Sequence, residues 1–149
     1  MRKIVIYTDG SCGPTNPGPG GWAAILKFPE SCVILQGNRR RTTNNQMELE
    51  AAISALAYLL ARLGQCEVDL HTDSKYVKLG ITRWIAKWER NGWQTATKKP
   101  VKNQAYWRDL RQFSQRHQVH WHWVKGHSQN RLNAQVDALA REAREGRIG

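Results

Sequence analysis

The chain contains 149 residues, and its 23 lysines and arginines outnumber its 12 aspartates and glutamates, so its formal net charge is +11 at pH 7. A chain of this length predicts one domain, residues 1–149, built around a single hydrophobic core. The positive surplus favours a polyanionic partner such as nucleic acid, with a basic but inert surface as the alternative.

The cysteines and the apolar segments indicate a reducing compartment and no membrane span. Cys12, Cys32 and Cys66 form neither a CxxC pair nor a zinc-binding pattern with histidine, and they are not an even set for disulfides. The apolar run at residues 4–7 is too short for a signal peptide, and no stretch approaches the roughly 18 apolar residues that a membrane helix requires. We therefore expect a cytoplasmic protein, and nothing in the sequence demands more than a monomer.

The amino-terminal part of the chain predicts three antiparallel strands. An apolar run at residues 3–9 ends at Asp9, and a loop rich in glycine and proline follows at residues 13–21. Two further strand-like runs, 22–28 and 32–36, are separated only by a short turn. Such connections are typical of an antiparallel meander, in which the second strand pairs with both neighbours.

A long apolar helix follows the meander. Residues 51–63 are apolar on nearly every side, the more polar residues 42–50 precede them, and Gly64 supplies a stop signal. A helix of this kind is usually buried. Glu48 shares a helix face with Leu56, so we expect its carboxylate at the amino-terminal end of the core-facing stripe.

The remaining elements continue the alternation of strands and helices. Residues 66–72 predict a fourth strand, which stops at Asp73. The later elements are short helices at 74–79 and 83–90, a longer helix at 103–117, a fifth strand at 119–124 and a last helix at 130–145. The order is therefore β-β-β-α-β-α-α-α-β-α, without a repeat, a low-complexity segment or an interdomain linker.

Two aspartates stand where apolar strands end. Asp9 and Asp73 each follow a threonine and precede a small residue, an arrangement that delivers a carboxylate to the carboxyl edge of a sheet. If the two strands are parallel neighbours, the two side chains meet. Either aspartate taken singly is more typical of a turn or a cap, but both together, with Glu48 on a buried helix face, favour a site.

The carboxyl-terminal part contributes two more candidates. Asp137 borders the packed stripe of the last helix, and its alternative role is an exposed acid paired with Arg141, worth about 0.3 to 0.5 kcal/mol. His127 lies in a glycine-containing loop after the fifth strand. A loop histidine is more often a solvated bystander, but beside a carboxylate centre it can shuttle a proton.

Four carboxylates that converge in a basic protein predict a divalent-metal site. Packed together, they raise each other's pKa values, so the cluster needs a cation to stay ionised. Oxygen ligands favour Mg²⁺ or Mn²⁺. A phosphodiester brings its own negative charge, which a metal bridges at the site while lysines and arginines hold the surrounding backbone. The opposed charges of site and surface therefore favour a nuclease.

One predicted helix has a basic face and an apolar face. The basic face comprises Arg83, Lys87 and Arg90. The apolar face comprises Trp84, Ile85 and Trp88. A solvated charged face is the alternative, but three lysines in the next loop, Lys98, Lys99 and Lys102, favour contact with phosphates.

Six motifs, in this order, resemble those of the bacterial type 1 ribonuclease H family. They are residues 8–12 (TDGSC), 16–21 (NPGPGG), 42–49 (TTNNQMEL), 72–77 (TDSKYV), 123–127 (WVKGH) and 137–140 (DALA). Each motif alone is weak, but six at compatible spacings make coincidence implausible. Two departures are a loop between Cys12 and Asn16 that is one residue longer than the usual bacterial pattern, and Ala134 in place of a familiar acid.

The resemblance implies an α/β fold of the ribonuclease H type, a five-stranded mixed sheet of three antiparallel strands and two parallel additions, flanked by helices. It implies cleavage of the RNA strand of RNA/DNA hybrids, with two Mg²⁺ or Mn²⁺ ions when substrate is bound. The implied metal-binding and catalytic carboxylates are Asp9, Glu48, Asp73 and Asp137, with His127 as an auxiliary catalytic residue. The implied hybrid-binding residues are Cys12, Asn16, Asn44, Asn45 and Gln46, together with Trp84, Lys87, Trp88, Lys98 and Lys99 in a basic, tryptophan-rich protrusion at about residues 83–102.

The chemistry so implied is two-metal phosphodiester hydrolysis that leaves 5′-phosphate and 3′-hydroxyl ends. Three rivals are a silent module that only binds hybrids or double-stranded RNA, a transposase, integrase or exonuclease relative that acts on DNA, and a basic ribosome-associated protein. The four carboxylates argue against the first and third. The short chain, with Asn44-Asn45 and the basic tryptophan-rich segment, argues against the second. A protein that recruits the enzyme is not predictable from the sequence.

Overall fold

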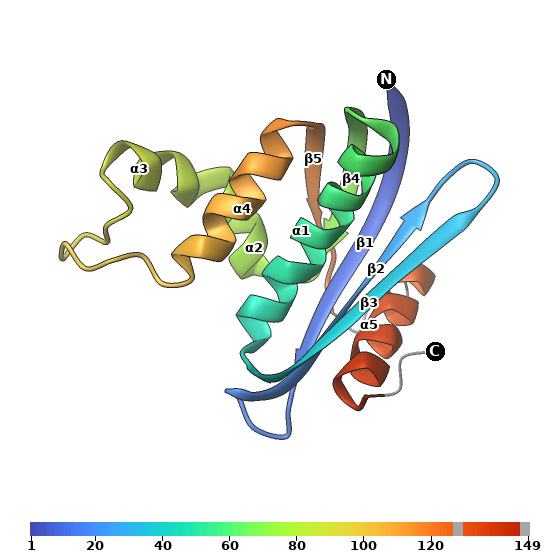
Figure 1. The fold of residues 1–149 in the computed structure, drawn as a ribbon, viewed down its shortest axis with the longest axis horizontal. Coiled ribbons are helices and arrows are strands. Elements are labelled where there is room, and N and C mark those ends of the chain that lie inside the picture. Colours follow the sequence, from blue (N-terminus) through green and yellow to red (C-terminus); the bar gives the residue numbers. More distant parts are fainter. Residues whose placement is uncertain (127–129, 147–149) are drawn as a thin grey trace.

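The structure, a computed structural model, describes residues 1–126 and 130–146 and contains one five-stranded mixed sheet in the order β3-β2-β1-β4-β5 (Figure 1). The strands are β1 (Arg2–Cys12), β2 (Gly18–Lys27), β3 (Cys32–Thr42), β4 (Cys66–Thr72) and β5 (Gln118–Trp123). β1 and β3 both pair with β2 in antiparallel fashion, whereas β1/β4 and β4/β5 are parallel pairs. The predicted meander and mixed sheet are therefore confirmed.

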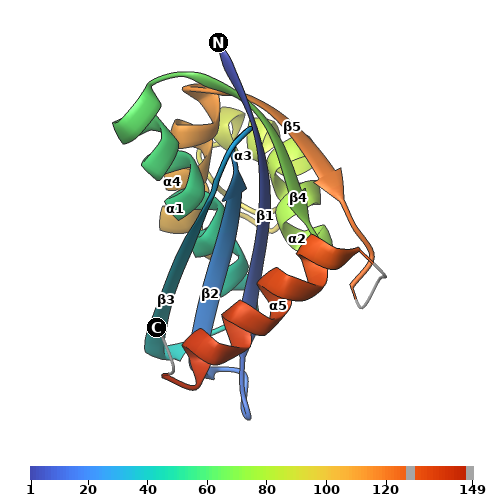
Figure 2. The same cartoon turned by 90° about the vertical axis from the view of Figure 1, so that its right-hand side faces the viewer.

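The helices lie on both faces of this sheet. They are α1 (Asn44–Leu63), α2 (Lys75–Leu79), α3 (Ile85–Arg90), α4 (Gln104–Gln115) and α5 (Arg131–Arg144), with a π-helical turn, η1 (Gly80–Trp84), between α2 and α3. α1 and α4 pack together on one face, and α5 covers β1, β2 and β3 on the other (Figures 1 and 2). Among the described residues, no helix combines the length and the apolar character needed to cross a membrane.

Alternating residues of the central strands supply two separate cores. Ala24 and Leu26 of β2 belong to the larger core, under α1, whereas Ala23 and Ile25 pack with Val136 of α5. Because both faces of the central strands are covered, these strands are apolar in continuous runs. Because these strands are held on both faces, a polar side chain at the end of one of them has a defined position.

The stop signal predicted at Gly64 is confirmed, and the structure adds a cap at the other end of α1 that was not predicted. The hydroxyl of Thr43 caps the helix by accepting a hydrogen bond from the Gln46 backbone amide over 3.1 Å, and Gly64 terminates it with a φ of +76°. A Cβ atom at Gly10 would lie 2.5 Å from the backbone nitrogen of Glu48. Glycine at this position therefore allows the first turn of α1 to lie directly against β1.

The break predicted between the helices at 74–79 and 83–90 is wrong, because η1 joins α2 to α3 without interruption. Gly80 packs against the indole of Trp107, and a Cβ at this position would overlap the ring. The π-helical turn thus coincides with a tertiary contact between residues far apart in the sequence.

Three strands extend further than their apolar runs predict. β2 begins at Gly18, inside the segment expected to be a loop at 13–21, because its first residues pair with β1 and β3. β1 continues past Asp9 to Cys12 because it remains paired with β2. β3 continues from residue 36 to Thr42 through three arginines that are exposed on the edge of the sheet. One of them, Arg39, forms an ion pair with Glu50 of α1 at 2.8 Å. Charged residues are usual on edge strands, where they oppose association with other sheets.

Candidate active site

Asp9 and Asp73 meet at the carboxyl edge of the β1/β4 pair. The parallel ladder ends with Thr8 opposite Thr72, and each aspartate is the next residue of its chain segment. After Asp73 the chain turns into α2, where the hydroxyl of Ser74 caps the helix by accepting a hydrogen bond from the Val77 amide. The predicted meeting of the two aspartates at neighbouring parallel strands is therefore confirmed.

Glu48 completes a cluster of three carboxylates. One oxygen from each of Asp9, Glu48 and Asp73 lies within 4.8 Å of the other two. Asp9 is only 3% exposed and accepts a hydrogen bond from the amide of Gly10 over 2.9 Å. Oε1 of Glu48 is buried without a hydrogen-bond partner. A buried, unpaired oxygen beside two other carboxylates fits a ligand of a hard cation such as Mg²⁺ or Mn²⁺.

Burial and mutual repulsion alter the protonation of this cluster. Desolvation, followed by the charge of Asp73, raises the pKa of Asp9 to about 8. Burial likewise raises the pKa of Glu48 well above its ordinary value, and the charges of Asp9 and Asp73 add to the shift. Without a cation the cluster therefore retains protons at neutral pH, and a metal ion that binds there must displace them.

Asp137, on α5, is not one of the three carboxylates that lie within 4.8 Å of one another, but it is near Asp9. It adds a smaller contribution to the raised pKa of Asp9, after desolvation and Asp73, which makes the two carboxyl groups neighbours. Oδ2 of Asp137 also lies 3.5 Å from Nη2 of Arg141, one helical turn later. The site role and the ion-pair role predicted as alternatives are therefore compatible, because a partly exposed pair of this kind is weak.

Two residues at and after the end of β5 support Asp73 in ways that the sequence does not reveal. The indole nitrogen of Trp123 donates a hydrogen bond to the backbone carbonyl of Asp73 over 3.1 Å. A Cβ atom at Gly126 would lie 3.3 Å from Oδ2 of Asp73, so a side chain here would crowd the carboxylate. The predicted auxiliary residue His127 lies outside the described residues.

The start of α1 and the loop after β1 form one exposed surface. Oδ1 of Asn16 accepts a hydrogen bond from the backbone amide of Asn44 over 3.2 Å, and Asn45 is exposed beside it. Sγ of Cys12 lies between 3.3 and 3.6 Å from three backbone carbonyl oxygens. They belong to Thr15 in the loop, Gly18 at the start of β2 and Thr42 at the end of β3. The longer loop thus closes on the thiol of Cys12 and keeps Asn16 against the start of α1.

Gln46 makes contacts that differ from those of its neighbours. Its Nε2 donates to Oδ1 of Asn103 over 3.1 Å, and its Oε1 accepts from the hydroxyl of Thr42 over 3.0 Å. Both ends of the amide are therefore engaged within the protein. A contact of Gln46 with substrate stays a prediction.

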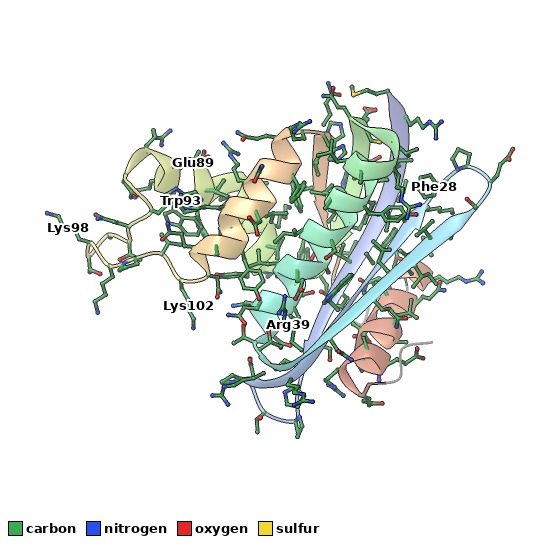
Figure 3. All side chains as sticks on the ribbon, in the orientation of Figure 1. Phe28, Arg39, Glu89, Trp93, Lys98 and Lys102 are labelled. Carbon is green, nitrogen blue, oxygen red and sulfur yellow. The ribbon has the colours of Figure 1, made fainter. Side chains whose placement is uncertain are left out.

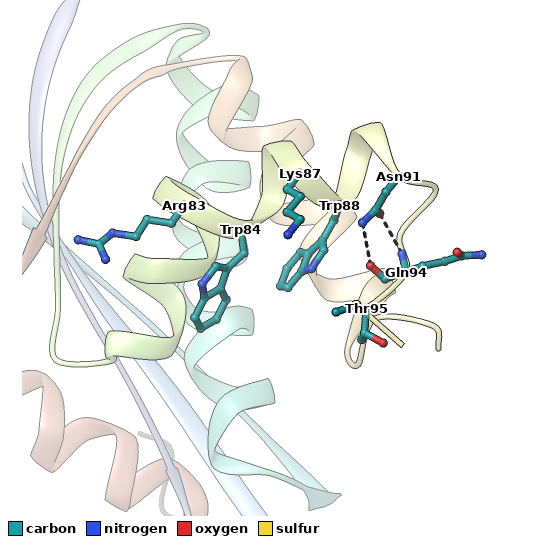
Figure 4. A pocket seen from close by; sticks show the side chains of 8 residues that line it. Arg83, Trp84, Lys87, Trp88, Asn91, Gln94 and Thr95 are labelled. Carbon is teal, nitrogen blue, oxygen red and sulfur yellow. Dashed lines mark hydrogen bonds between the residues drawn. The ribbon is translucent and has the colours of Figure 1, made fainter. Parts of the chain in front are cut away.

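The basic protrusion, residues 83–102, extends away from the sheet (Figure 1) and contains part of a cluster of tryptophans. The ring of Trp88 lies 5.9 Å from Trp84, 6.2 Å from Trp93 and 5.5 Å from Trp107, measured between centroids. Lys98 and Lys102 point outward from the protrusion (Figure 3), and Arg83 and Lys87 flank a pocket beside Trp84 and Trp88 (Figure 4). The exposed basic residues include Arg83, Lys87, Arg90, Lys98 and Lys99. The basic residues are exposed and Ile85 is buried as predicted, but Trp84 and Trp88 line the same pocket as Arg83 and Lys87, so the prediction of an opposite face is wrong for these tryptophans.

Sequence comparison extends the resemblance to nearly the whole chain. A model of the RNase H family matches residues 1–145. A ribonuclease H of Bradyrhizobium diazoefficiens is 58% identical over 142 residues, which cover 95% of this chain and 90% of that protein. A ribonuclease H of Brucella anthropi is 54% identical over 145 residues, which cover 97% of this chain and 92% of that protein.

Solved structures have the same fold. LC9-RNase H1, described as a type 1 RNase H with the type 2 active-site motif, matches with a TM-score of 0.89 and 28% identity over 99% of this chain and 74% of that chain. LC11-RNase H1, solved in complex with an RNA/DNA hybrid, matches with a TM-score of 0.73 and 22% identity over 98% of this chain and 99% of that chain. The second likeness concerns the fold alone.

Proposed function

The chain belongs to the ribonuclease H family, and we propose that it hydrolyses the RNA strand of RNA/DNA hybrids by two-metal-ion catalysis. Its membership makes it a hydrolytic endoribonuclease. The observation that carries the finer proposal is the cluster of Asp9, Glu48 and Asp73, with Asp137 beside it, in a chain of net charge +11. A protein that only bound nucleic acid would gain nothing from carboxylates placed against phosphate.

The four carboxylates are proposed to hold two Mg²⁺ or Mn²⁺ ions when substrate is bound. Ions of this kind activate water, stabilise the leaving 3′ oxygen and so yield 5′-phosphate and 3′-hydroxyl ends. Asp9 and Glu48 must lose their protons to act as ligands, which the raised pKa values make costly in the absence of a cation. The hydrogen bond from Trp123 holds the backbone of Asp73, and Gly126 leaves room beside its carboxylate. His127 is proposed to move a proton beside this cluster.

Selectivity for RNA is proposed to arise at the start of α1. Asn16 and Asn44 form a continuous exposed surface there, and Glu48 follows Asn44 by about one helical turn on the same side. Contacts from this surface to 2′-hydroxyl groups would place the adjoining phosphodiester next to the carboxylates. Only RNA offers such hydroxyl groups, so DNA in the same position would lose these hydrogen bonds.

The DNA strand is proposed to bind the basic protrusion through its phosphates. Lys87, Lys98 and Lys99 are exposed, and the tryptophans beneath them hold the segment in place. Phosphate contacts position a nucleic acid without reading its sequence, so little base preference is expected. All residues in the proposal come from one chain, so a monomer is sufficient.

A panel of labelled substrates tests this function. RNA/DNA hybrid, double-stranded RNA, double-stranded DNA and the single strands are each incubated with Mg²⁺ and with a chelator, with Asp73→Asn as the matched inactive control. Only the RNA of the hybrid should be cut, and only with Mg²⁺. Binding of the hybrid without cleavage would support the silent-module rival instead, and cleavage of duplex DNA would support a DNA-acting relative.

A further inference from the structure

The outer face of β4 and β5 carries imidazoles and carboxylates that the proposed reaction does not use. α5 packs on β1, β2 and β3 and leaves this part of the sheet open (Figure 2). The side chains on the open face include Glu67, Asp69, His71, His120 and His122. The residues that alternate with them, such as Leu70 and Trp121, pack in the core on the opposite face.

Asp69 contacts one exposed histidine and is the ladder partner of a second, and its Oδ2 also lies 3.9 Å from Nζ of Lys3. It is the ladder partner of His120, and its Oδ1 lies 2.9 Å from Nε2 of His122. Nε2 of His120 lies 3.7 Å from Oε2 of Glu67. The side chains of His120 and His122 are 56% and 45% exposed, so an ion from solvent can reach both imidazoles.

Stacking holds the ring of His122 in place before any ligand binds. Its centroid lies 4.7 Å from that of His71 at an interplanar angle of 18°. His71 in turn stacks on Tyr7, with centroids 4.4 Å apart and an angle of 9°. Tyr7 is largely buried, so the stack is anchored in the core. His122 therefore loses little further side-chain conformational entropy when it binds a metal ion.

We propose that Asp69, His120 and His122 form a second metal site, for a divalent transition metal such as Zn²⁺. Two imidazoles and a carboxylate suit Zn²⁺, Ni²⁺ or Cu²⁺, whereas the all-oxygen cluster at Asp9 suits Mg²⁺ or Mn²⁺. Tetrahedral zinc bonds of about 2.0 to 2.1 Å place adjacent ligand atoms about 3.3 Å apart, so the 2.9 Å now present between Asp69 and His122 needs only a small widening.

One side chain must turn to complete this site. Among the described residues, three donor atoms come within 4.8 Å of one another only in the Asp9 cluster. His120, now directed toward Glu67, would therefore rotate toward Asp69, the residue directly opposite it in the ladder. Both residues are at the surface, so this rotation disturbs no core packing.

The second site is separate from the first. Asp69 lies on the strand that leads to Asp73, about 13 Å away at the rise of an extended chain. A metal ion at Asp69 would link β4 to β5, the strand at the edge of the sheet. A ligand that binds the folded chain and not the unfolded chain raises the apparent stability, so Zn²⁺ should also raise the Tm.

Zinc titration of the whole chain tests the proposal by NMR of the imidazole nitrogens and by thermal unfolding. Zn²⁺ should shift the Nε2 resonances of His120 and His122 and raise the Tm. The double variant His120→Asn/His122→Asn should lose the rise. Cys32→Ser and Asp73→Asn should keep both effects, because they remove the two competing kinds of ligand, an exposed thiol and the oxygen cluster.

Two results would overturn the site. One is the absence of shifts at both histidines, and the other is equal zinc affinity in the chain with both histidines replaced. Asp69→Asn preserves the shape of the side chain. It should weaken zinc binding, measured by calorimetry, in the unaltered chain and in the Cys32→Ser and Asp73→Asn variants. Unchanged affinity in that variant would remove Asp69 from the site and contradict the arrangement proposed, even if the histidine variant failed to fold.

Discussion

Gln46 donates a hydrogen bond to Asn103 over 3.1 Å and so joins the first turn of α1 to the residue that precedes α4. Asn103 in turn donates to the hydroxyl of Tyr76 over 3.1 Å, and the same hydroxyl accepts from the indole of Trp107 over 3.1 Å. Tyr76 lies before the basic protrusion and Asn103 after it. The helix that carries Glu48 is therefore tied to both ends of the protrusion.

This connection predicts an energetic coupling between Gln46 and Asn103. Gln46→Ala and Asn103→Gly should each lower the free energy of unfolding by about 1 kcal/mol, the usual net worth of a hydrogen bond. Glycine is the matched replacement because Asn103 has a φ of +61°. Urea denaturation of the double variant should show a coupling of about 0.5 kcal/mol or more. Strictly additive losses would show that the two side chains do not depend on each other.

Asp73→Asn should abolish cleavage and leave the fold intact. The two side chains are nearly isosteric, and the hydrogen bond from Trp123 goes to the backbone of residue 73, which the change preserves. The variant also removes one of the charges that raise the pKa of Asp9, so its stability in chelator should equal or exceed that of the unaltered chain. Turnover and urea denaturation measure the two effects. Unaltered turnover would exclude Asp73 as a metal ligand.

The raised pKa of Asp9 predicts how metal-free stability depends on pH. Its folded pKa is about 8 against an ordinary value of 3.8, so the protonated group contributes stability that is complete below pH 3.8 and is lost as the pH rises through about 8. Asp9→Asn cannot lose a proton. In chelator, the stability of this variant relative to the unaltered chain should therefore grow with pH over this range. A constant difference would mean that Asp9 does not titrate there.

Neutralising Lys87, Lys98 and Lys99 together should raise KM for the hybrid with little change in kcat, because these contacts act equally before and during the reaction. Each lost phosphate contact lowers the slope of log affinity against log salt by roughly 0.7 to 0.9, so the triple change should lower it by about two. Lys27→Ala, beside Phe28 at the opposite end of the molecule, serves as the control (Figure 3). An unchanged KM and an unchanged salt slope would show that these lysines face solvent and do not contact the hybrid.

Sequence reasoning predicts the parts of the fold that depend on local pattern. The apolar run and Gly64 indicate α1, and each Thr-Asp places its aspartate directly after an apolar run, at Asp9 and at Asp73. Glu48 follows from its helix face. These features are predictable because burial, periodicity and capping act between residues that are close in the sequence.

Contacts between distant residues account for what the sequence does not predict. η1 coincides with the packing of Gly80 on Trp107, and the amide of Gln46 is engaged by Asn103. Neither partner can be identified before the chain is folded. The pairing of Asp69 with His122 likewise depends on the parallel alignment of β4 with β5. Helix periodicity relates residues at fixed separations in the sequence. Strand pairing joins residues whose separation in the sequence can take any value.

The chemical nature of the cleaved ends tests metal-dependent hydrolysis at Asp9, Glu48 and Asp73 most directly. The RNA strand of a hybrid, labelled at either end, is incubated with the protein in Mg²⁺ or in chelator, and the products are identified by mass spectrometry. We predict 5′-phosphate and 3′-hydroxyl ends in Mg²⁺ and intact RNA in chelator. Cleavage that persists in chelator and leaves 2′,3′-cyclic phosphates would contradict the mechanism, because such ends arise when the RNA's own 2′-hydroxyl attacks.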